Sequence, residues 1–89
     1  MRIEFDHEKD TANLAKHGVS LALASELEWE SALVWTDARK LYGETRQCAL
    51  ALRGDRIYFA AFVIRAGARR MISLRKANER EVRRYAQDD

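Results

Sequence analysis

The sequence predicts an α+β fold, a small antiparallel meander sheet with two N-terminal helices and one C-terminal helix in the order β-α-α-β-β-β-β-α. Three observations predict it. Helix-capping residues frame segments near both ends of the chain, polar and apolar residues alternate through 45–52, and the run 57–64 is almost entirely apolar. The 89 residues contain no proline, repeat or low-complexity segment, so we expect one domain spanning 1–89.

The N-terminal third predicts a strand followed by two helices. Residues 2–5 alternate in polarity, which is typical of a short strand. Asp6 is a favourable N-cap, and Gly18 is a favourable stop signal, for a helix over 7–17. A second helix, rich in Leu and Ala, is expected near 21–28.

The middle of the chain predicts three strands. The first covers 32–35, and the polar stretch 37–43 that follows is interpreted as a loop. Strands over 45–52 and 57–64 form a hairpin around the turn Gly54-Asp55. The apolar run of the second strand predicts that it lies in the centre of the sheet.

A shorter fourth strand is expected over 69–74, after a turn at Ala66-Gly67. Strict alternation along this strand divides its side chains between two faces. One face would carry Arg70, Ile72 and Leu74, and the other would carry Met71 and Ser73. The charge of Arg70 on an apolar face is costly unless it is paired or functional.

The end of the chain is basic. Residues 65–85 contain eight Lys and Arg against two Glu, whereas residues 1–64 contain eight basic and ten acidic residues. Asn78 is expected to cap a terminal helix that runs to about Ala86. Such a cationic segment suits a polyanion such as nucleic acid or an acidic protein partner, unless it is simply a solvated surface.

The composition also excludes several classes of protein. The single Cys48 excludes an internal disulfide and a cysteine-rich zinc site. His7 and His17 are ten residues apart and do not stack on one helix face, so no metal site is expected. No apolar run approaches the length of a membrane span and no secretory leader opens the chain, which predicts a cytoplasmic location without membrane contact.

Three groups of residues are candidates for chemistry. Lys16 and His17 either hold a phosphate and transfer a proton, or only complement the C-terminus of the first helix. Glu44 and Arg46 form either a salt bridge or a catalytic pair. The third group falls at the ends of adjacent predicted strands, which would bring its members to one surface: Arg65, Arg70 and Arg75.

Three spaced stretches resemble the BrnT family of ribonuclease toxins from bacterial type II toxin–antitoxin modules. The family's opening pattern is close to F-E-W-D-x-x-K-x-x-x-N-x-x-K-H-G-V-S-F, its middle pattern is an Asp followed by G-E-x-R, and its closing pattern is R-I-I-S-A-R-K-A followed by E-x-x-x-Y. The matching stretches are residues 3–21, Asp37 with 43–46, and 70–77 with Glu81 and Tyr85. The chain departs from the patterns at Phe5, Leu21 and Leu74, where Trp, Phe and Ala are usual.

The resemblance implies a fold similar to the RelE-type toxins and cleavage of RNA that requires no metal or other cofactor. It implies inhibition of translation until an antitoxin of the BrnA type, encoded nearby, binds the toxin. The DNA-binding part of that antitoxin would bring the complex to operator DNA. A homodimer or a higher complex with antitoxin is expected, and the terminal helix and the strand over 69–74 are candidate contact surfaces.

On this resemblance, we expect Arg65 and Arg70 to clamp the phosphate, and His17 or Glu44 to act as the general base. The residues expected to support RNA binding are Lys16, Arg46, Arg75, Lys76 and Tyr85. Two alternatives remain open. The same residues would suit a nucleic-acid-binding module without catalysis, or a protein-interaction module that docks an acidic partner.

Overall fold

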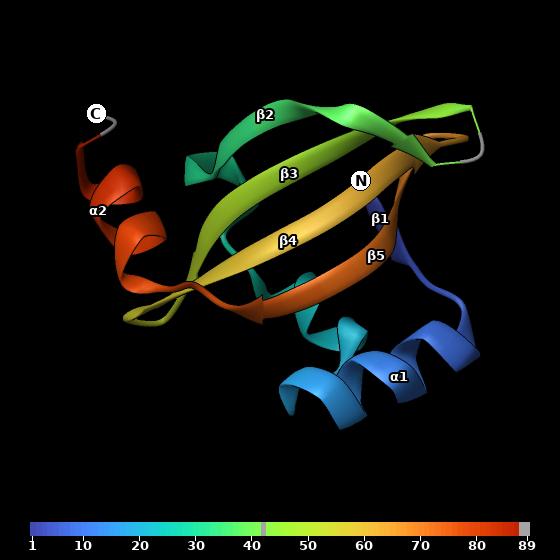
Figure 1. Cartoon of the computed structure of the whole chain (residues 1–89), viewed down its shortest axis with the longest axis horizontal. Coiled ribbons are helices and arrows are strands. Elements are labelled where there is room, and N and C mark those ends of the chain that lie inside the picture. The colour runs from blue at the N-terminus through green and yellow to red at the C-terminus, as the bar shows by residue number, and fades with distance from the viewer. Residues whose placement is uncertain (42, 88–89) are drawn as a thin grey trace.

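The structure, a computed structural model, describes residues 1–41 and 43–87, with only the backbone described for 39–41. It is an α+β fold built on a five-stranded sheet (Figure 1). The elements in chain order are β1 (Arg2–Glu4), α1 (His7–His17), the 3₁₀ helices η1 (Leu21–Glu26) and η2 (Trp29–Ser31), β2 (Leu33–Leu41), β3 (Glu44–Arg53), β4 (Arg56–Arg65), β5 (Ala68–Lys76) and α2 (Glu79–Gln87).

The sheet has the strand order β1-β5-β4-β3-β2. Strands β2 to β5 form the expected antiparallel meander. The sheet as a whole is mixed, however, because β1 lies parallel to β5. The prediction of a purely antiparallel sheet is therefore wrong, because the N-terminal strand returns to the far edge of the meander instead of remaining outside it.

The first helix has the predicted bounds. Asp6 Oδ1 accepts a hydrogen bond from the Glu8 N–H at 2.8 Å. Gly18 ends the helix in the left-handed conformation, with φ of 72°, and its N–H donates to Leu14 O at 2.8 Å. Local capping chemistry alone therefore defines this element.

The predicted α-helix near 21–28 is wrong, because the segment forms η1 and then η2. Its buried residues are Leu21, Ala24 and Leu27, three positions apart, which is the period of a 3₁₀ helix. Its end is bound to the sheet, since the Glu28 N–H donates to Leu52 O at 2.8 Å. This contact with β3 prevents a regular α-helix from continuing.

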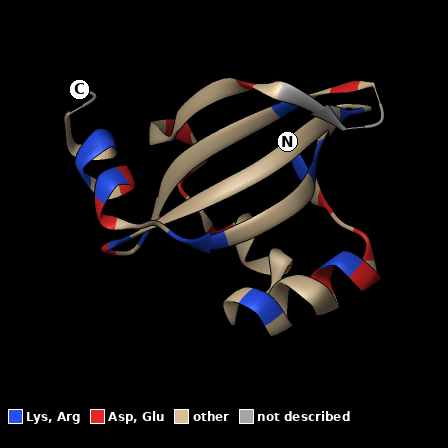
Figure 2. Cartoon of the chain, viewed as in Figure 1, with Lys and Arg blue, Asp and Glu red and all other residues tan. Residues whose placement is uncertain are grey.

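The main hydrophobic core lies between the sheet and the segment 19–27, which contains η1 (Figure 1). The buried residues of this core are Val19, Leu21, Ala24, Leu27, Ala49, Ala51, Tyr58, Ala60, Phe62, Met71 and Leu74. Charged residues gather near the ends of the strands and on the two α-helices, whereas the middle of β3 and β4 carries none (Figure 2). None of the helices in the described part of the chain has the length and apolarity needed to cross a lipid bilayer.

A β-bulge interrupts β5 at Ile72. Ser73 pairs with Ala61, but the next pair toward the N-terminus of β5 joins Met71 to Phe62, which leaves Ile72 without an opposite residue. Met71 and Leu74 consequently share the core face, while Arg70 and Ser73 share the other face. The predicted alternation, which groups Arg70 with Leu74, is wrong because it assumes an uninterrupted pleat.

The end of β2 differs from the prediction. The expected loop over 37–43 is wrong for its first part, because β2 continues to Leu41 after an irregularity between Thr36 and Lys40; Tyr42 lies outside the described residues. An edge strand tolerates such polar residues, because it has one side without a neighbouring strand.

The predicted terminal helix is confirmed. Asn78 Oδ1 accepts a hydrogen bond from the Glu81 N–H, and Glu81 Oε1 accepts one from the Asn78 N–H, both at 2.9 Å.

Candidate functional site

Two adjoining pockets lie along the edge of β5, where α1 packs beside the strand. The arginine pocket has a volume of about 330 Å³ and is lined by Asp6, Lys9, Val63, Arg65, Arg70, Met71 and Ile72. The histidine pocket has a volume of about 250 Å³ and is lined by Lys9, Ala12, Asn13, Lys16, His17, Ile72 and Ser73. Lys9 and Ile72 line both pockets, so the two adjoin each other at these side chains.

The local structure explains why a concave region forms here. Strand β1 pairs with β5 only as far as Arg70, so the edge of β5 beyond this residue has no strand partner. The bulge at Ile72 bends the strand at the same point. The edge is covered instead by α1, one face of which presents Lys9 and Lys16 to the pockets.

Asn13 fixes α1 to this strand edge. Its Nδ2 donates to Leu74 O and to Val19 O, each at 2.8 Å, and its Oδ1 accepts from the Leu74 N–H at 3.1 Å. The side chain amide thus pairs with β5 as a neighbouring strand would, and it is only 5% exposed. This bonding sets the position of Lys9, Lys16 and His17 relative to β5.

Arg65 extends into the arginine pocket from the end of β4. Its Nε donates to Glu44 Oε2 at 3.1 Å and its Nη2 donates to Glu44 Oε1, which makes a bidentate pair. The Arg65 hydrogen bond holds the pKa of Glu44 below its ordinary value, although the carboxylate is at the surface. The guanidinium is half exposed and its Nη1 lies outside this pair, so it can also approach a phosphate.

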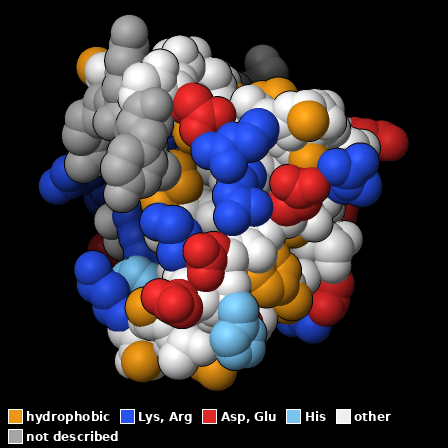
Figure 3. Space-filling view, turned by 90° about the vertical axis from the view of Figure 1, so that its right-hand side faces the viewer, with side chains coloured by type: hydrophobic (Ala, Val, Ile, Leu, Met, Phe, Trp, Pro, Cys, Tyr) orange, Lys and Arg blue, Asp and Glu red, His pale blue; other side chains and the backbone are white. Residues whose placement is uncertain are grey.

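Arg70 extends into the same pocket from β5. Its Nη1 lies 3.9 Å from Glu4 Oε1, and Glu4 also accepts a hydrogen bond from Arg2 at 2.8 Å. That hydrogen bond from Arg2, together with the charge of Arg70, holds the pKa of Glu4 below its ordinary value. Figure 3 shows this end of the molecule, where Lys and Arg side chains lie among Asp and Glu side chains.

Lys16 and His17 lie at the last turn of α1, in the histidine pocket. Lys16 is exposed and His17 is half-buried. Basic residues are favourable at the negative end of a helix dipole, so a structural role of Lys16 and His17 at the helix end is compatible with a role in the pocket. The structure therefore places Lys16 and His17 beside the arginine pocket, and Lys9 lies where the two pockets adjoin.

Arg46 lies on β3, on the same face of the sheet as Arg70. It pairs across the strands with Val63, which lines the arginine pocket, and its Nε lies 3.4 Å from Asp37 Oδ2. Glu44 and Arg46 therefore do not form the expected salt bridge with each other, because each is paired with another residue. Cys48 Sγ donates to the same Asp37 carboxylate at 3.6 Å, and burial raises the pKa of this thiol.

The other predicted residues lie at the opposite end of the sheet, near α2. Arg75 donates to both Glu81 oxygens, at 2.8 and 2.9 Å, and stacks over Phe59 with 4.3 Å between its guanidinium carbon and the ring centre. Burial tends to raise the pKa of Glu81, but the hydrogen bonds from Arg75 and from the Asn78 N–H outweigh it and the pKa is lowered. Tyr85 Oη donates to Ser31 O at 3.2 Å, so these residues hold α2 in place.

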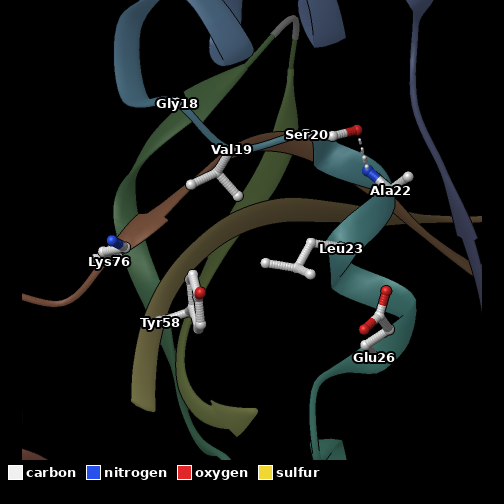
Figure 4. A pocket seen from close by; sticks show the side chains of 8 residues that line it. All are labelled: Gly18, Val19, Ser20, Ala22, Leu23, Glu26, Tyr58 and Lys76. Carbon is white, nitrogen blue, oxygen red and sulfur yellow. Dashed lines mark hydrogen bonds between the residues drawn. The ribbon is translucent and has the colours of Figure 1, made fainter.

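Lys76 lies away from the arginine and histidine pockets. It lines a separate pocket of about 330 Å³ on the core side of the sheet, together with Glu26, Tyr58 and the segment after α1 (Figure 4). The predicted residues thus form three groups. Arg65, Arg70, Lys16 and His17 line the adjoining pockets, with Glu44 and Arg46 beside them. Arg75 and Tyr85 anchor α2, and Lys76 lines a separate pocket.

Lys9 is absent from the predicted site residues, yet it lines both pockets. The spacing of Lys9 and Lys16 contained the signal, because seven residues make about two helical turns and place both side chains on the same helix face. Asn13 lies between them on that face.

Comparison with known proteins places the chain in a family. A family model described as the ribonuclease toxin BrnT of type II toxin–antitoxin systems matches residues 5–81. Among curated proteins, no significant match is found. The family match contains every residue that lines the two adjoining pockets. Since it covers most of the 89 residues, the chain belongs to the BrnT family, the ribonuclease toxins of type II toxin–antitoxin systems, and has an antitoxin as its partner.

Proposed function

We propose that this toxin is an endoribonuclease that cleaves RNA at the two adjoining pockets without a metal ion. In this reaction the ribose 2′-hydroxyl attacks the neighbouring phosphorus, the bond to the 5′-oxygen breaks, and the products carry a 2′,3′-cyclic phosphate and a 5′-hydroxyl. The observation that supports the proposal is the side-by-side placement of phosphate-binding cations and a histidine.

Arg65 and Arg70 are proposed to clamp the reacting phosphate. Their guanidinium groups come from adjacent strands into one pocket, and their planar forks match phosphate oxygens. Glu44 and Glu4 hold the two arginines before substrate binds, which keeps the forks near the position where negative charge develops. A preorganised positive charge of this kind supplies the charge neutralisation that a metal ion provides in other nucleases.

His17 is proposed as the general base, in preference to Glu44. A carboxylate whose pKa is lowered by an arginine is a weak base near neutral pH, and the Glu44 oxygens are already engaged by Arg65. Imidazole is suited to accept a proton near neutral pH. Lys9 lines both pockets, and its ammonium is proposed to protonate the leaving 5′-oxygen.

The wider role follows from the family. We propose a fold relationship to the RelE-type toxins, cytoplasmic action on RNA that inhibits translation, and neutralisation by an antitoxin of the BrnA type that also binds operator DNA. A homodimer or a higher complex with antitoxin belongs to the same proposal. Arg46, Arg75, Lys76 and Tyr85 are proposed as outer RNA contacts, and in the free protein Arg75 and Tyr85 also hold α2.

The test is cleavage of end-labelled RNA in EDTA by the wild type, Arg70→Ala and Arg83→Ala. Arg83 is an exposed arginine on α2 and serves as the matched control. We expect 2′,3′-cyclic phosphate ends from the wild type, a loss of about 100-fold or more in Arg70→Ala, and wild-type activity in the control. Equal cleavage by Arg70→Ala would show that the site is elsewhere, and activity restored only by added magnesium would contradict metal independence.

Two further outcomes would replace the proposal with one of the alternatives. RNA binding without cleavage would indicate a nucleic-acid-binding module, in which the same arginines only hold phosphates. Neither binding nor cleavage would indicate a protein-interaction module whose basic surface docks an acidic partner.

A further inference from the structure

We infer that the substrate is an unpaired RNA segment whose successive phosphates occupy the two pockets, one on each side of Ile72. The first phosphate lies against Arg65 and Arg70, and its neighbour lies against Lys16. This inference rests on the proposed function, because it describes how the RNA crosses the same site.

The two pockets are distinct positions along one path. They share Lys9 and Ile72, so they meet at these two side chains. Lys9 and Lys16 are seven residues apart on α1, which is about 10.5 Å along the helix axis. One phosphate cannot contact both ends of this row of lysines, whereas two linked phosphates can, because the long Lys9 and Lys16 side chains shorten the separation set by the helix.

The balance of charge differs between the pockets. In the arginine pocket Asp6 is part of the lining, and Arg65 and Arg70 are paired with Glu44 and Glu4. The described lining of the histidine pocket contains Lys9, Lys16 and His17 and no carboxylate. A phosphate in the histidine pocket thus meets positive charge that its own lining does not neutralise, which favours binding there.

Ile72 determines the form of RNA that fits. The bulge places its half-exposed apolar side chain between the two phosphate positions. The nucleoside that joins the two phosphates must then pack against Ile72, and a base inside a duplex is not available for such a contact. The opposite wall is rigid, because Asn13 bonds α1 to the backbone of Leu74.

The experiment compares dinucleotides of mixed sequence that carry no terminal phosphate, a 5′-phosphate or a 3′-phosphate. We expect one of the two added phosphates to raise kcat/KM of the wild type by about 10- to 100-fold, the effect of one additional charged hydrogen bond. This gain should disappear in Lys16→Ala and persist in Arg83→Ala, which removes an exposed cation on α2 far from both pockets.

The outcomes separate this inference from the proposed function. If long RNA is cleaved but neither added phosphate changes kcat/KM, or if Lys16→Ala keeps the gain, the inference is wrong and the proposed function stands. If no RNA is cleaved, the proposed function fails, and the salt dependence of binding to a single-stranded oligonucleotide becomes the test. Lys16→Ala should then reduce the slope of log K against log salt by about 0.7, and an unchanged slope would overturn the inference.

The requirement for unpaired RNA has its own measurement. A duplex of the same sequence should compete at least tenfold less well than the single strand at equal salt. Equal competition would contradict the placement of a nucleoside against Ile72.

Discussion

Replacement of Asn13 by alanine should destabilise the protein strongly, although it removes only a small polar side chain. Three backbone groups, Val19 O, Leu74 O and Leu74 N–H, lose their partner, and Leu74 itself is fully buried. A buried polar group without a partner costs about 1–3 kcal/mol. Because water can reach part of the strand edge after truncation, we expect a total loss of about 3–5 kcal/mol in the free energy of unfolding.

Urea denaturation followed by tryptophan fluorescence measures this loss. For a chain of this size a loss of 3–5 kcal/mol lowers the midpoint by about 2–3 M at an m-value of about 1.5 kcal/mol/M. The matched control is Asn78→Ala, which removes an exposed N-cap and should cost only about 1 kcal/mol. If Asn13→Ala costs no more than this control, Asn13 does not tie α1 to β5.

A second variant keeps the test decisive if Asn13→Ala fails to fold. In Asn13→Asp the side chain still accepts from the Leu74 N–H, but a carboxylate then faces the two carbonyl oxygens of Leu74 and Val19. Burial and these oxygens should raise the pKa of the new carboxyl in the folded state. The stability of Asn13→Asp should therefore recover as the pH falls, and a stability that only declines on acidification would refute the reasoning.

Three other predictions follow from the site and the core. His17→Ala should lower kcat at least 100-fold while Glu44→Gln stays within about tenfold of the wild type, and the reverse order in single-turnover cleavage would make Glu44 the base. Glu81, whose folded-state pKa is lowered, stabilises α2 above its ordinary pKa of 4.5, so this stability declines as the pH falls through the folded pKa; Glu81→Gln should flatten that decline in acid titrations. Leu74→Ala should lower the free energy of unfolding by about 2–5 kcal/mol in urea denaturation, and a smaller loss would show that the core relaxes to fill the cavity.

Local chemistry explains which elements the sequence predicts. The bounds of α1 and the start of α2 follow from caps that act within three or four residues, Asp6, Gly18 and the pair Asn78 and Glu81. The hairpin of β3 and β4 follows from alternation around a turn. None of these features requires knowledge of the tertiary structure.

The errors occur where tertiary contacts override local preference. Residues 21–26 contain good helix formers, but the apolar residues that pack against the sheet are three positions apart, which favours a 3₁₀ helix. The polar residues after Thr36 remain in β2 because the strand is at an edge. The parallel pairing of β1 joins residues 2–4 to residues 68–70, a distance in sequence at which no pattern in either segment identifies the partner.

The same distinction applies to the candidate site. Arg65 and Arg70 converge as expected from adjacent strand ends, because a hairpin fixes their relation. Arg75 belongs to the same strand, but it lies at the other end and is paired with Glu81. Lys76, its neighbour, points to the opposite face because successive side chains alternate. A motif thus identifies positions, whereas the strand direction decides which of them meet.

The bulge at Ile72 explains why the predicted faces of β5 are wrong, and it also shapes the site of the proposed function. Without the extra residue, alternation would place Ser73 with Met71 on the core side and Leu74 with Arg70 on the other side. With it, the Leu74 side chain enters the core and its backbone binds Asn13, while Arg70 and Ser73 lie on the other face and line neighbouring pockets. One inserted residue therefore brings Leu74 into the core, where its backbone binds Asn13 of α1, and places Ile72 between the two pockets that we propose as phosphate positions.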